Sequence, residues 1–406
     1  ITFLSLAKPL FDGSDGQILQ FFKTFLHLAY LMIFALTAFT GVIENKHIFK
    51  VLKILLFLSI FVNLFAFYQL VARVYDLPFS WIVLNSNNLH ERVTESDGYE
   101  QFALKYENFY RGTSIFSEPS ALASFNLMML SFLLPQLDSN SKFLKSFKYI
   151  VFLVLLSVLT LFITFSLTAL VGLAFLFVTT FFLGSRKFRI TFFKVIGVGT
   201  ALLLIADFFT ADFVGISVFE LFADRVLGII EAIVKGQGSG ISGESFFLRV
   251  STLFSGFDIF LDNHFFGVGL GLYGYNNSLY MFPDSGLPQI IAETGLFGTI
   301  FFYLIIFTTV YLNLHLIKVN SKKHFLDNSE ILLLKIGITT LAYLFFIVSF
   351  TGNIFISSGL WLPIFIPFAI LYNTYFKYKK HKIIFTYREQ TIASKFATKL
   401  NHQLNN

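Results

Sequence analysis

Residues 147–184 read FKYIVFLVLLSVLTLFITFSLTALVGLAFLFVTTFFLG, an apolar run of 38 residues. About 20 apolar residues are enough for a helix to cross a bilayer, so the run is too long for one span by about a factor of two. Lys and Arg flank it on both sides, in SKFLKSFK (141–148) and SRKFR (185–189). A hairpin that turns near Phe165–Thr168 puts both basic flanks on one side of the membrane, whereas a single tilted helix separates them. We expect the hairpin.

The composition of the whole chain is that of a membrane protein. Of its 406 residues, 55% are hydrophobic and 13% are charged, and the mean hydropathy is +0.72. Soluble domains carry about 25% charged residues. The absence of Cys excludes disulfides and thiolate metal sites. The net charge of +6 is not by itself a sign of nucleic-acid binding, and we expect no nucleic-acid partner.

Nine apolar segments have a length suited to crossing a membrane. They are residues 20–41, 50–72, 119–136, 147–164, 167–184, 190–207, 296–317, 332–350 and 359–376. Basic stretches occur at residues 44–53, 141–148, 185–189, 317–325 and 377–382. With the hairpin, all five basic stretches fall on the cytoplasmic side. We therefore expect an all-α polytopic fold, a single integral membrane domain over residues 1–406 with about nine to eleven transmembrane helices.

Two long segments between the spans carry charges of both signs. They cover about residues 73–118 and 208–292, and we expect them to be external loops with short surface helices. The tail, residues 377–406, is then cytoplasmic, and its basic start suits an anionic leaflet. The opening ITFLSLAKPL (1–10) looks like the end of an earlier span, so we expect further residues before Ile1.

The first external loop enters a span through YRGTSIFSEPSALASFN (110–126). Pro119 fits the first turn of a helix, where its missing N–H has no helical acceptor. Glu118 then stands at the helix N-terminus, where capping and a functional role are equally good interpretations. Arg111 lies just before this point, and capping does not explain it.

The second external loop predicts surface helices. FADRVLGIIEAIVKGQGSG (222–240) is amphipathic, and another helix starts at Arg249. Leu253, Phe257 and Phe260 mark one face of that helix at i, i+4 and i+7. We expect it to lie along the membrane surface.

A glycine-rich segment follows, DNHFFGVGLGLYGYNNSLYMFPDSGLPQIIAETGLFG (262–298). Glycine allows positive φ and close backbone approach, so Gly267 and Gly269 are candidates for contact with a ligand head group. The chain then enters a hydrophobic helix through Glu293 and Gly295. A Walker loop needs Gly-Lys-Ser/Thr and a dinucleotide fingerprint needs a preceding strand, so nucleotide-binding sites are excluded.

Charged residues of the two loops suggest a site. Arg111, Arg225 and Arg249 each adjoin a helix start or a glycine-rich segment, and a guanidinium binds phosphate oxygens in a bidentate manner. The same loops carry Glu118, Asp284, Glu293 and His264. Each residue alone is most simply a solvated charge. Together they form a candidate cavity that binds a pyrophosphate and deprotonates a hydroxyl.

Three blocks resemble the O-antigen polymerase and O-antigen ligase superfamily, the Wzy-type polysaccharide polymerases. They are RGTSIFSEPSALASF (111–125), FITFSLTALVGL (162–173) and NHFFGVGLGLYG…DSGLPQIIAETGLFG (263–298). The likeness covers most of the chain in topology, and the sequence matches are confined to these blocks. The family's hairpin turn commonly reads Ser-Arg, where this chain has Ser166-Leu167. Ligases carry His-Asn where this chain has Asp284-Ser285, which favours the polymerase.

The resemblance implies a glycosyl transfer. A growing glycan on undecaprenyl pyrophosphate moves to a sugar hydroxyl of a lipid-linked repeat unit, and the lipid pyrophosphate leaves. The implied catalytic residues are Asp284, Glu293 and Arg249, as acceptor of the hydroxyl proton and as stabiliser of the leaving group. The implied substrate-binding residues are Arg111, Arg225, Glu118, His264, Gly267 and Gly269. We expect no metal and no cofactor.

The protein is thus expected to be a glycosyltransferase of the bacterial inner membrane with a periplasmic or extracellular active face. Its expected partners are undecaprenyl-pyrophosphate-linked glycans and membrane lipid, with a chain-length regulator and a flippase as further candidates. The alternatives are an O-antigen ligase, a lipid-linked oligosaccharide flippase or transporter, and a non-catalytic scaffold. Transporters typically show internal repeats that meet at mid-membrane, and no repeat is visible here.

Overall fold

The apolar run 147–184 folds as a hairpin in the computed structural model of the chain. Helix α5 (Phe147–Ile163) and helix α6 (Leu167–Leu183) are separated only by Thr164, Phe165 and Ser166. Phe165 takes a φ of 45°, which reverses the chain, and the Thr164 hydroxyl donates to the Leu161 carbonyl at 2.7 Å. The hairpin prediction is confirmed, with the turn about one residue earlier than expected.

The structure describes residues 9–10, 13–39, 43–82, 105–106, 109–116, 118–138, 144, 146–214, 217, 219–220, 223, 227, 230, 240–276, 286–350, 361 and 363–379. Nearly all of the regular structure in these ranges is helical, as predicted. The exception is a short antiparallel pair of strands, β1 (Lys105–Tyr106) and β2 (Phe109–Tyr110).

The remaining helices cover the other predicted spans and part of the second loop. They are α2 (Asp15–Phe39), α3 (Asn45–Val74), α4 (Pro119–Leu133) with the 3-10 turn η3 (Leu134–Leu137), α7 (Arg186–Val214), α9 (Gly240–Asp262), the 3-10 turn η4 (Tyr273–Tyr275), α10 (Gly286–Lys323), α11 (Asn328–Phe350) and a helix over residues 363–379. Within the described residues, five helices are long and apolar enough to cross a membrane, and α5 and α6 are shorter apolar helices. The total of nine to eleven spans stays a prediction.

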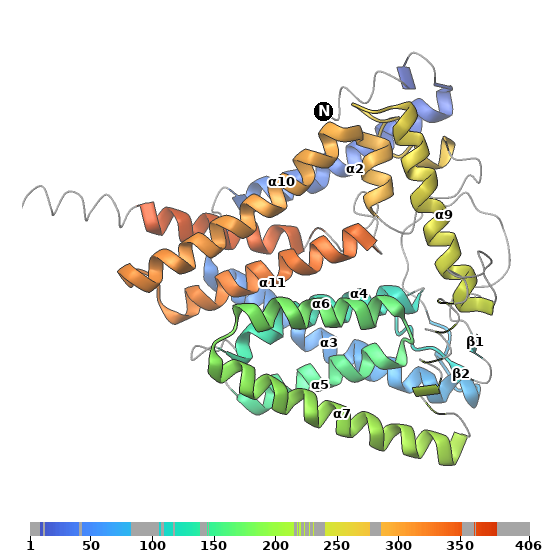
Figure 1. Cartoon of the computed structure of the whole chain (residues 1–406), viewed down its shortest axis with the longest axis vertical. Helices are drawn as coiled ribbons and strands as arrows, with labels where there is room; N and C mark the ends of the chain where they lie inside the picture. The colour runs from blue at the N-terminus through green and yellow to red at the C-terminus, as the bar shows by residue number, and fades with distance from the viewer. Residues whose placement is uncertain are drawn as a thin grey trace, which may run out of the picture.

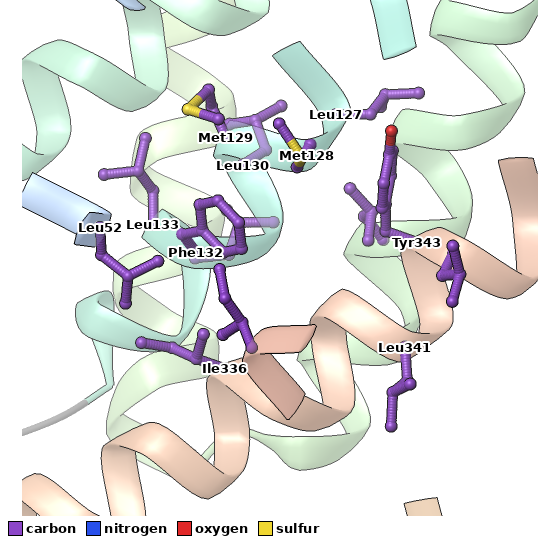
Figure 2. Packing of buried hydrophobic residues seen from close by; sticks show 14 of the residues in the cluster. Leu52, Leu127, Met128, Met129, Leu130, Phe132, Leu133, Ile336, Leu341 and Tyr343 are labelled. Carbon is purple, nitrogen blue, oxygen red and sulfur yellow. The ribbon is translucent and has the colours of Figure 1, made fainter. Parts of the chain in front are cut away.

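Helices α4 and α11 form the centre of the bundle. In both, 78% of the most apolar window is buried, against 33% or less in α2, α3 and α10. Figure 2 shows Phe132 and Leu133 of α4 near Ile336 of α11, with Leu52 of α3 beside Leu133, and all four side chains are fully buried. The outer helices expose many large apolar side chains, as expected where lipid replaces water.

One end of the bundle, called the hairpin end here, contains the turn Thr164–Ser166. The helix α3 ends there and α4 and α6 begin there, as the contacts of Arg73 and Arg111 described below establish. Figure 1 shows α9 running crosswise to α4 and α6 along this end of the bundle.

The opposite end, called the linker end here, collects the basic stretches. Asp138, after η3, accepts a hydrogen bond from the backbone N–H of Ser185 at 3.2 Å and forms an ion pair with Lys335 of α11. Lys377 forms an ion pair with Glu330 at 2.7 Å.

The remaining linker joins the same end through Asn373. Its side-chain amide donates to the carbonyl of Ile43, between α2 and α3, at 2.8 Å. Phe325, between α10 and α11, contacts Tyr378, with ring centroids 5.2 Å apart and the rings tilted by 45°. The described parts of the basic stretches therefore lie at one end of the bundle, in agreement with the prediction from their charge.

Candidate functional site

Arg73, in the last turn of α3, is a buried cation at the hairpin end, 6% exposed. Its Nη1 and Nη2 donate to the Arg111 carbonyl and the Thr113 hydroxyl, both at 2.6 Å, and Nε donates to the Ser80 carbonyl at 3.1 Å. The guanidinium carbon lies 4.8 Å from the centre of the Trp81 ring, a cation–π contact. Among the described residues no carboxylate forms an ion pair with Arg73. The described groups around the Arg73 guanidinium are therefore uncharged: two backbone carbonyls, a hydroxyl and the Trp81 ring.

Arg111 follows β2 and is also buried, at 5% exposure. Its Nε donates to the Thr164 carbonyl at 2.8 Å and its Nη2 to the Phe165 carbonyl at 3.4 Å. The adjacent Gly112 N–H donates to the Ile163 carbonyl at 2.9 Å. These carbonyls end α5, where unpaired C=O groups carry partial negative charge and favour a cation. Arg111 thus ties the first loop to the hairpin turn.

Polar side chains of α3 complete this contact. Gln69 donates to the Ser114 carbonyl at 2.9 Å and accepts from the Thr113 hydroxyl at 3.3 Å. Asn63, on the same buried stripe of α3, is 1% exposed, and its side-chain N and O have no partner among the described residues. Buried amides of this kind mark places where water or a polar ligand binds.

The arginine cluster is defined as Gln69, Arg73, Arg111, Thr113 and Ser114.

A second structure at the hairpin end joins the glycine-rich segment to α10 by exchanged backbone hydrogen bonds. In a continuous helix, Leu296 N–H donates to the Ala292 carbonyl, four residues back. Here Leu296 donates to the His264 carbonyl at 2.9 Å, and Val268 donates to the Ala292 carbonyl at 2.9 Å. His264 and Val268 are themselves four residues apart, which is the spacing of a hydrogen bond within a helix. Each segment therefore donates to a carbonyl of the other segment instead of to its own.

The next pair of residues repeats the exchange. Phe297 donates to the Phe265 carbonyl at 3.4 Å, and Gly269 donates to the Glu293 carbonyl at 3.1 Å. The break in α10 therefore leaves these backbone groups paired, which removes most of the cost of interrupting a helix. The glycine clasp is defined as residues 264–273 together with residues 292–297.

Glycine is required at the two places where the backbones of the clasp meet. Gly295 has φ 63° and ψ −164°, a conformation essentially restricted to glycine. A Cβ on Gly295 would lie 2.5 Å from the carbonyl carbon of Phe265. Gly267 has φ 71°, and its Cβ would lie 2.4 Å from the carbonyl carbon of Glu293. We expected the backbone at Gly267 to contact a ligand head group. In the structure, Gly267 and Gly295 instead lie against other backbone segments of the same chain.

The carboxylate of Glu293 sits inside the clasp with 0% exposure. One oxygen accepts from the Gly271 N–H at 2.9 Å, and the other accepts from the Tyr273 N–H at 3.3 Å and the Gln289 side chain at 2.9 Å. A buried carboxylate is tolerated only with such donors. A Cβ on Gly271 would lie 2.2 Å from Thr24 Oγ1, so the clasp also packs against α2.

Helix α9 is fixed to the clasp through Tyr273. The Tyr273 side chain is fully buried, and its hydroxyl donates to the Thr252 carbonyl at 2.6 Å. Burial raises the pKa of Tyr273 to about 12, so the phenol stays protonated. The packed face of α9 carries Thr252, Gly256 and Ile259, whereas Phe257 of the predicted apolar face is 38% exposed. Leu253 and Phe260, the other two residues of that face, are half-buried, and the position of α9 at a membrane surface stays a prediction.

The clasp and the arginine cluster lie at the same end of the bundle. The hydroxyls of Tyr303 in α10 and Ser349 in α11 are 3.0 Å apart, next to the end of α11 at Phe350. Gly295 is two helical turns before Tyr303, about 12 Å further along. The described parts of the segments 110–126 and 262–295, which are residues 110–116, 118–126, 262–276 and 286–295, therefore lie at one end of the bundle.

Comparison with known families identifies part of the chain. The family model described as O-antigen ligase matches residues 152–303. The matched region belongs to the O-antigen polymerase and ligase superfamily. A comparison with curated proteins found no match. The resemblance drawn from the sequence is confirmed at the level of the superfamily, whose members are glycosyl-transferring enzymes.

The superfamily match covers the hairpin turn, α6, α7, α9 and the glycine clasp. The arginine cluster lies outside the matched residues and contacts them through Arg111. Helix α10 continues beyond the match at residue 303. The contacts of Thr164 and Phe165 with Arg111 are thus the point where the superfamily region meets the first loop.

The structure describes only some of the site residues inferred from the superfamily resemblance. Glu118 is exposed and stands at the N-cap position of α4; its side chain accepts from the Ser120 hydroxyl in the first turn at 2.8 Å and makes no bond to a backbone N–H of that turn. His264 is exposed, with its ring centroid 5.7 Å from that of Phe260. Arg225 and Asp284 lie outside the described residues, as does the side chain of Arg249. Their convergence with Arg111 stays a prediction. The prediction that a helix starts at Arg249 was wrong, because α9 already begins at Gly240.

Sequence reasoning missed Arg73 and Gln289. Gln69 and Arg73 are four residues apart near the end of α3, and Gln289 and Glu293 are four residues apart near the start of α10. Residues at this spacing share a helix face. Polar pairs at i, i+4 beside the ends of the predicted spans were therefore a usable signal. Within the described ranges, no three His, Asp or Glu side chains are placed to hold a metal ion.

Proposed function

We propose that this protein is a polysaccharide polymerase that joins undecaprenyl-pyrophosphate-linked repeat units at the outer face of the inner membrane. A sugar hydroxyl of one repeat unit attacks the anomeric carbon of the glycan on the other lipid. The glycosidic bond forms as the bond from the anomeric carbon to the phosphate oxygen breaks. The lipid pyrophosphate leaves with the electron pair, and the hydroxyl proton passes to a carboxylate.

The observation that carries the proposal is the burial of two guanidinium groups, Arg73 and Arg111, of which Arg111 contacts the hairpin turn within the matched residues. Two guanidinium groups held close to one turn raise the local electrostatic potential, which favours binding of an anionic lipid head group there. Charge that develops on the departing pyrophosphate is stabilised by the same groups. Arg225 and Arg249 are proposed to add to this potential.

The proposed roles of the acids differ with their surroundings. Glu293 accepts three hydrogen bonds inside the clasp, which supports a role in holding the glycine-rich segment in place. Asp284 is proposed as the group that receives the hydroxyl proton. Asp284-Ser285, in place of the His-Asn pair of ligases, supports a polymerase.

An O-antigen ligase is the second candidate function. The matched family model carries that description, which favours it directly. The two activities share the donor and the leaving group and differ in the acceptor. The acceptor of a ligase is the lipid A core, whereas the acceptor of a polymerase is a second lipid-linked unit.

The decisive experiment supplies each acceptor separately. The purified full chain in lipid nanodiscs is mixed with a synthetic undecaprenyl-pyrophosphate oligosaccharide, and products are separated by gel electrophoresis. A ladder of longer glycans without lipid A core supports the polymerase. Products only after addition of lipid A core establish the ligase instead. If no new glycosidic bond forms under either condition, both candidate functions are contradicted.

Variants then connect the activity to the arginine cluster. Arg111→Lys keeps the charge but replaces a fork that reaches two carbonyls with a single ammonium. We expect at least a tenfold loss of polymer formation. The matched control is Arg189→Lys at the linker end, where Arg189 stacks on the ring of Phe181 at 4.8 Å. Equal activity of both variants contradicts the proposed role of Arg111.

A further inference from the structure

An apolar cavity of about 200 Å³ lies between the helices of the hairpin and its neighbours. Its lining comes from η3, α5, α6 and α7, and apart from Gly199 and Thr200 all the lining side chains are hydrocarbon or aromatic. On α5 the lining runs from Val154 through Val158 to Phe162. On α7 it runs from Phe192 through Ile196 to Thr200.

The shape of the cavity follows from these spacings. Eight residues separate the first and last lining positions on each of α5 and α7, which is about 12 Å of helix. Val158 and Ile196 are half-buried and Thr200 is exposed, so the lining reaches the outer surface of the bundle. The cavity is therefore a slot parallel to the helices, open to the place where lipid chains lie.

The volume fits a short piece of hydrocarbon chain. An apolar cavity of about 150 Å³ in another protein stays dry and takes up benzene. The present cavity of about 200 Å³ holds one or two isoprene units on the same scale. A polar ligand is excluded because the lining offers almost no hydrogen-bond partners.

The position of the cavity indicates which chain enters it. Phe162 lines the slot, and Thr164 and Phe165, just beyond it on the chain, accept hydrogen bonds from Arg111. The end of the slot at Phe162 is therefore within about 5 Å, along the helix axis, of a bound guanidinium. A molecule with an anionic phosphate and an attached hydrocarbon chain matches both features at once.

We infer that the slot between α5 and α7 binds the phosphate-proximal isoprene units of a polyprenyl phosphate, with the phosphate towards the arginine cluster. The inference rests on the proposed function, because that function supplies a polyprenyl-linked donor. It adds a binding site for the lipid portion and places the donor on the α5–α7 side of the bundle.

Gly199 offers a direct test. It is buried on α7 and lines the slot, and a Cβ on it would meet only Leu155 Cδ2, at an ordinary 3.7 Å. Gly199→Leu therefore fills the slot without displacing backbone. Gly197 is exposed on the same helix, with nothing within 4 Å of an added Cβ, so Gly197→Leu is the matched control. Both changes replace glycine inside a helix, which favours folding.

The probe is undecaprenyl phosphate with a photoreactive diazirine near its phosphate end, in nanodiscs that hold the full chain. We expect crosslinks to residues of α5 and α7 in the wild type, at least tenfold fewer in Gly199→Leu, and a change of less than twofold in Gly197→Leu. Gly199→Ala, with only one added methyl group, is expected to fall between. Melting temperatures at or above that of the wild type establish that the variants are folded.

Several outcomes overturn the inference. Crosslinking that is unchanged in Gly199→Leu, or that maps to other helices, shows that the slot does not hold the polyprenyl chain. A competition experiment uses a phosphatidylglycerol that carries a diazirine. If this lipid crosslinks to the slot and undecaprenyl phosphate does not displace it, the slot binds bulk phospholipid. The inference and the proposed function can fail separately. If Gly199→Leu loses probe binding but the wild type makes no polymer, the slot binds the polyprenyl chain and the proposed function is wrong.

Discussion

Gly295 lies so close to Phe265 that a Cβ on Gly295 would come within 2.5 Å of the Phe265 carbonyl oxygen. Two segments about 30 residues apart are thereby held backbone to backbone, and they exchange the hydrogen bonds that each would otherwise form within a helix. The contact places the beginning of α10, with Glu293, at a fixed position on the hairpin end. It also explains why this hydrophobic helix is entered through glycine.

The first prediction concerns this contact. Gly295→Ala forces a side chain into a conformation essentially restricted to glycine, at a cost of about 1–3 kcal/mol before the clash with Phe265 is counted. We expect a lower melting temperature and loss of glycan transfer. Gly197→Ala, at an exposed helical position, serves as the control and should be neutral or slightly stabilising. A Gly295→Ala protein as stable as the wild type would show that the clasp is not rigid.

The second prediction separates two roles for Glu293. Glu293→Gln points an amide N–H₂ at one of the backbone donors that now face the carboxylate, at a cost of about 1–3 kcal/mol. We expect reduced thermal stability and activity together, with the shape of the pH–rate profile unchanged. Loss of the acid limb of that profile at full stability would instead identify Glu293 as the base. Stability by thermal unfolding and activity by gel are measured on the same preparations.

The third prediction concerns the linker end. The side chains of Asp138 and Lys335 are 5% and 19% exposed in their ion pair. Asp138→Ala leaves Lys335 without its partner and should destabilise the protein by about 3 kcal/mol. The double variant Asp138→Ala/Lys335→Met should recover most of that loss, as measured by thermal unfolding.

A surface pair provides the comparison for this ion pair. Lys46 and Glu44 are 69% and 60% exposed, and Lys46→Met should change stability by less than about 1 kcal/mol. If Asp138→Ala is equally mild, the ion pair at the linker end does not hold η3 to α11. If the double variant is no better than the single one, the loss comes from Ser185 and not from the unpaired lysine.

The fourth prediction is a pH dependence. The pKa of Tyr273 is raised to about 12, from an ordinary value of 10, so between these pH values the folded state binds a proton that the unfolded state has lost. Stability contributed by Tyr273 is therefore complete below pH 10 and falls as the pH rises towards 12. Tyr273→Phe should flatten this slope in unfolding measurements from pH 8 to 11.5. An identical slope in both proteins would assign the effect to other groups.

The hairpin and the helical spans were predictable because each depends on local sequence. The 38-residue run is too long for one span, and the basic flanks select between a hairpin and a single helix. The start of α4 at Pro119 follows from the missing N–H of proline. The importance of Arg111 was also indicated, since it adjoins the helix and is not explained by capping.

Other parts of the site depended on contacts that no local pattern encodes. Arg73 was only one of several arginines in the sequence, and its burial results from Arg111, Thr113 and Ser80 meeting around it. The glycines 267 and 269 suggested access for a ligand head group. In the structure the Glu293 carbonyl group lies against them, because residues 264–269 pair with the break in α10.

By itself, the sequence determined that the chain is a helical membrane protein, where its apolar helices lie and which linkers share a side, because hydropathy and charge act residue by residue along the chain. Only the tertiary structure decided that two arginines are buried together, that Glu293 is enclosed by the clasp, and that a slot remains between α5 and α7. These features arise from long-range packing, in which the partner of each group is set by the folded backbone and not by its neighbours in sequence.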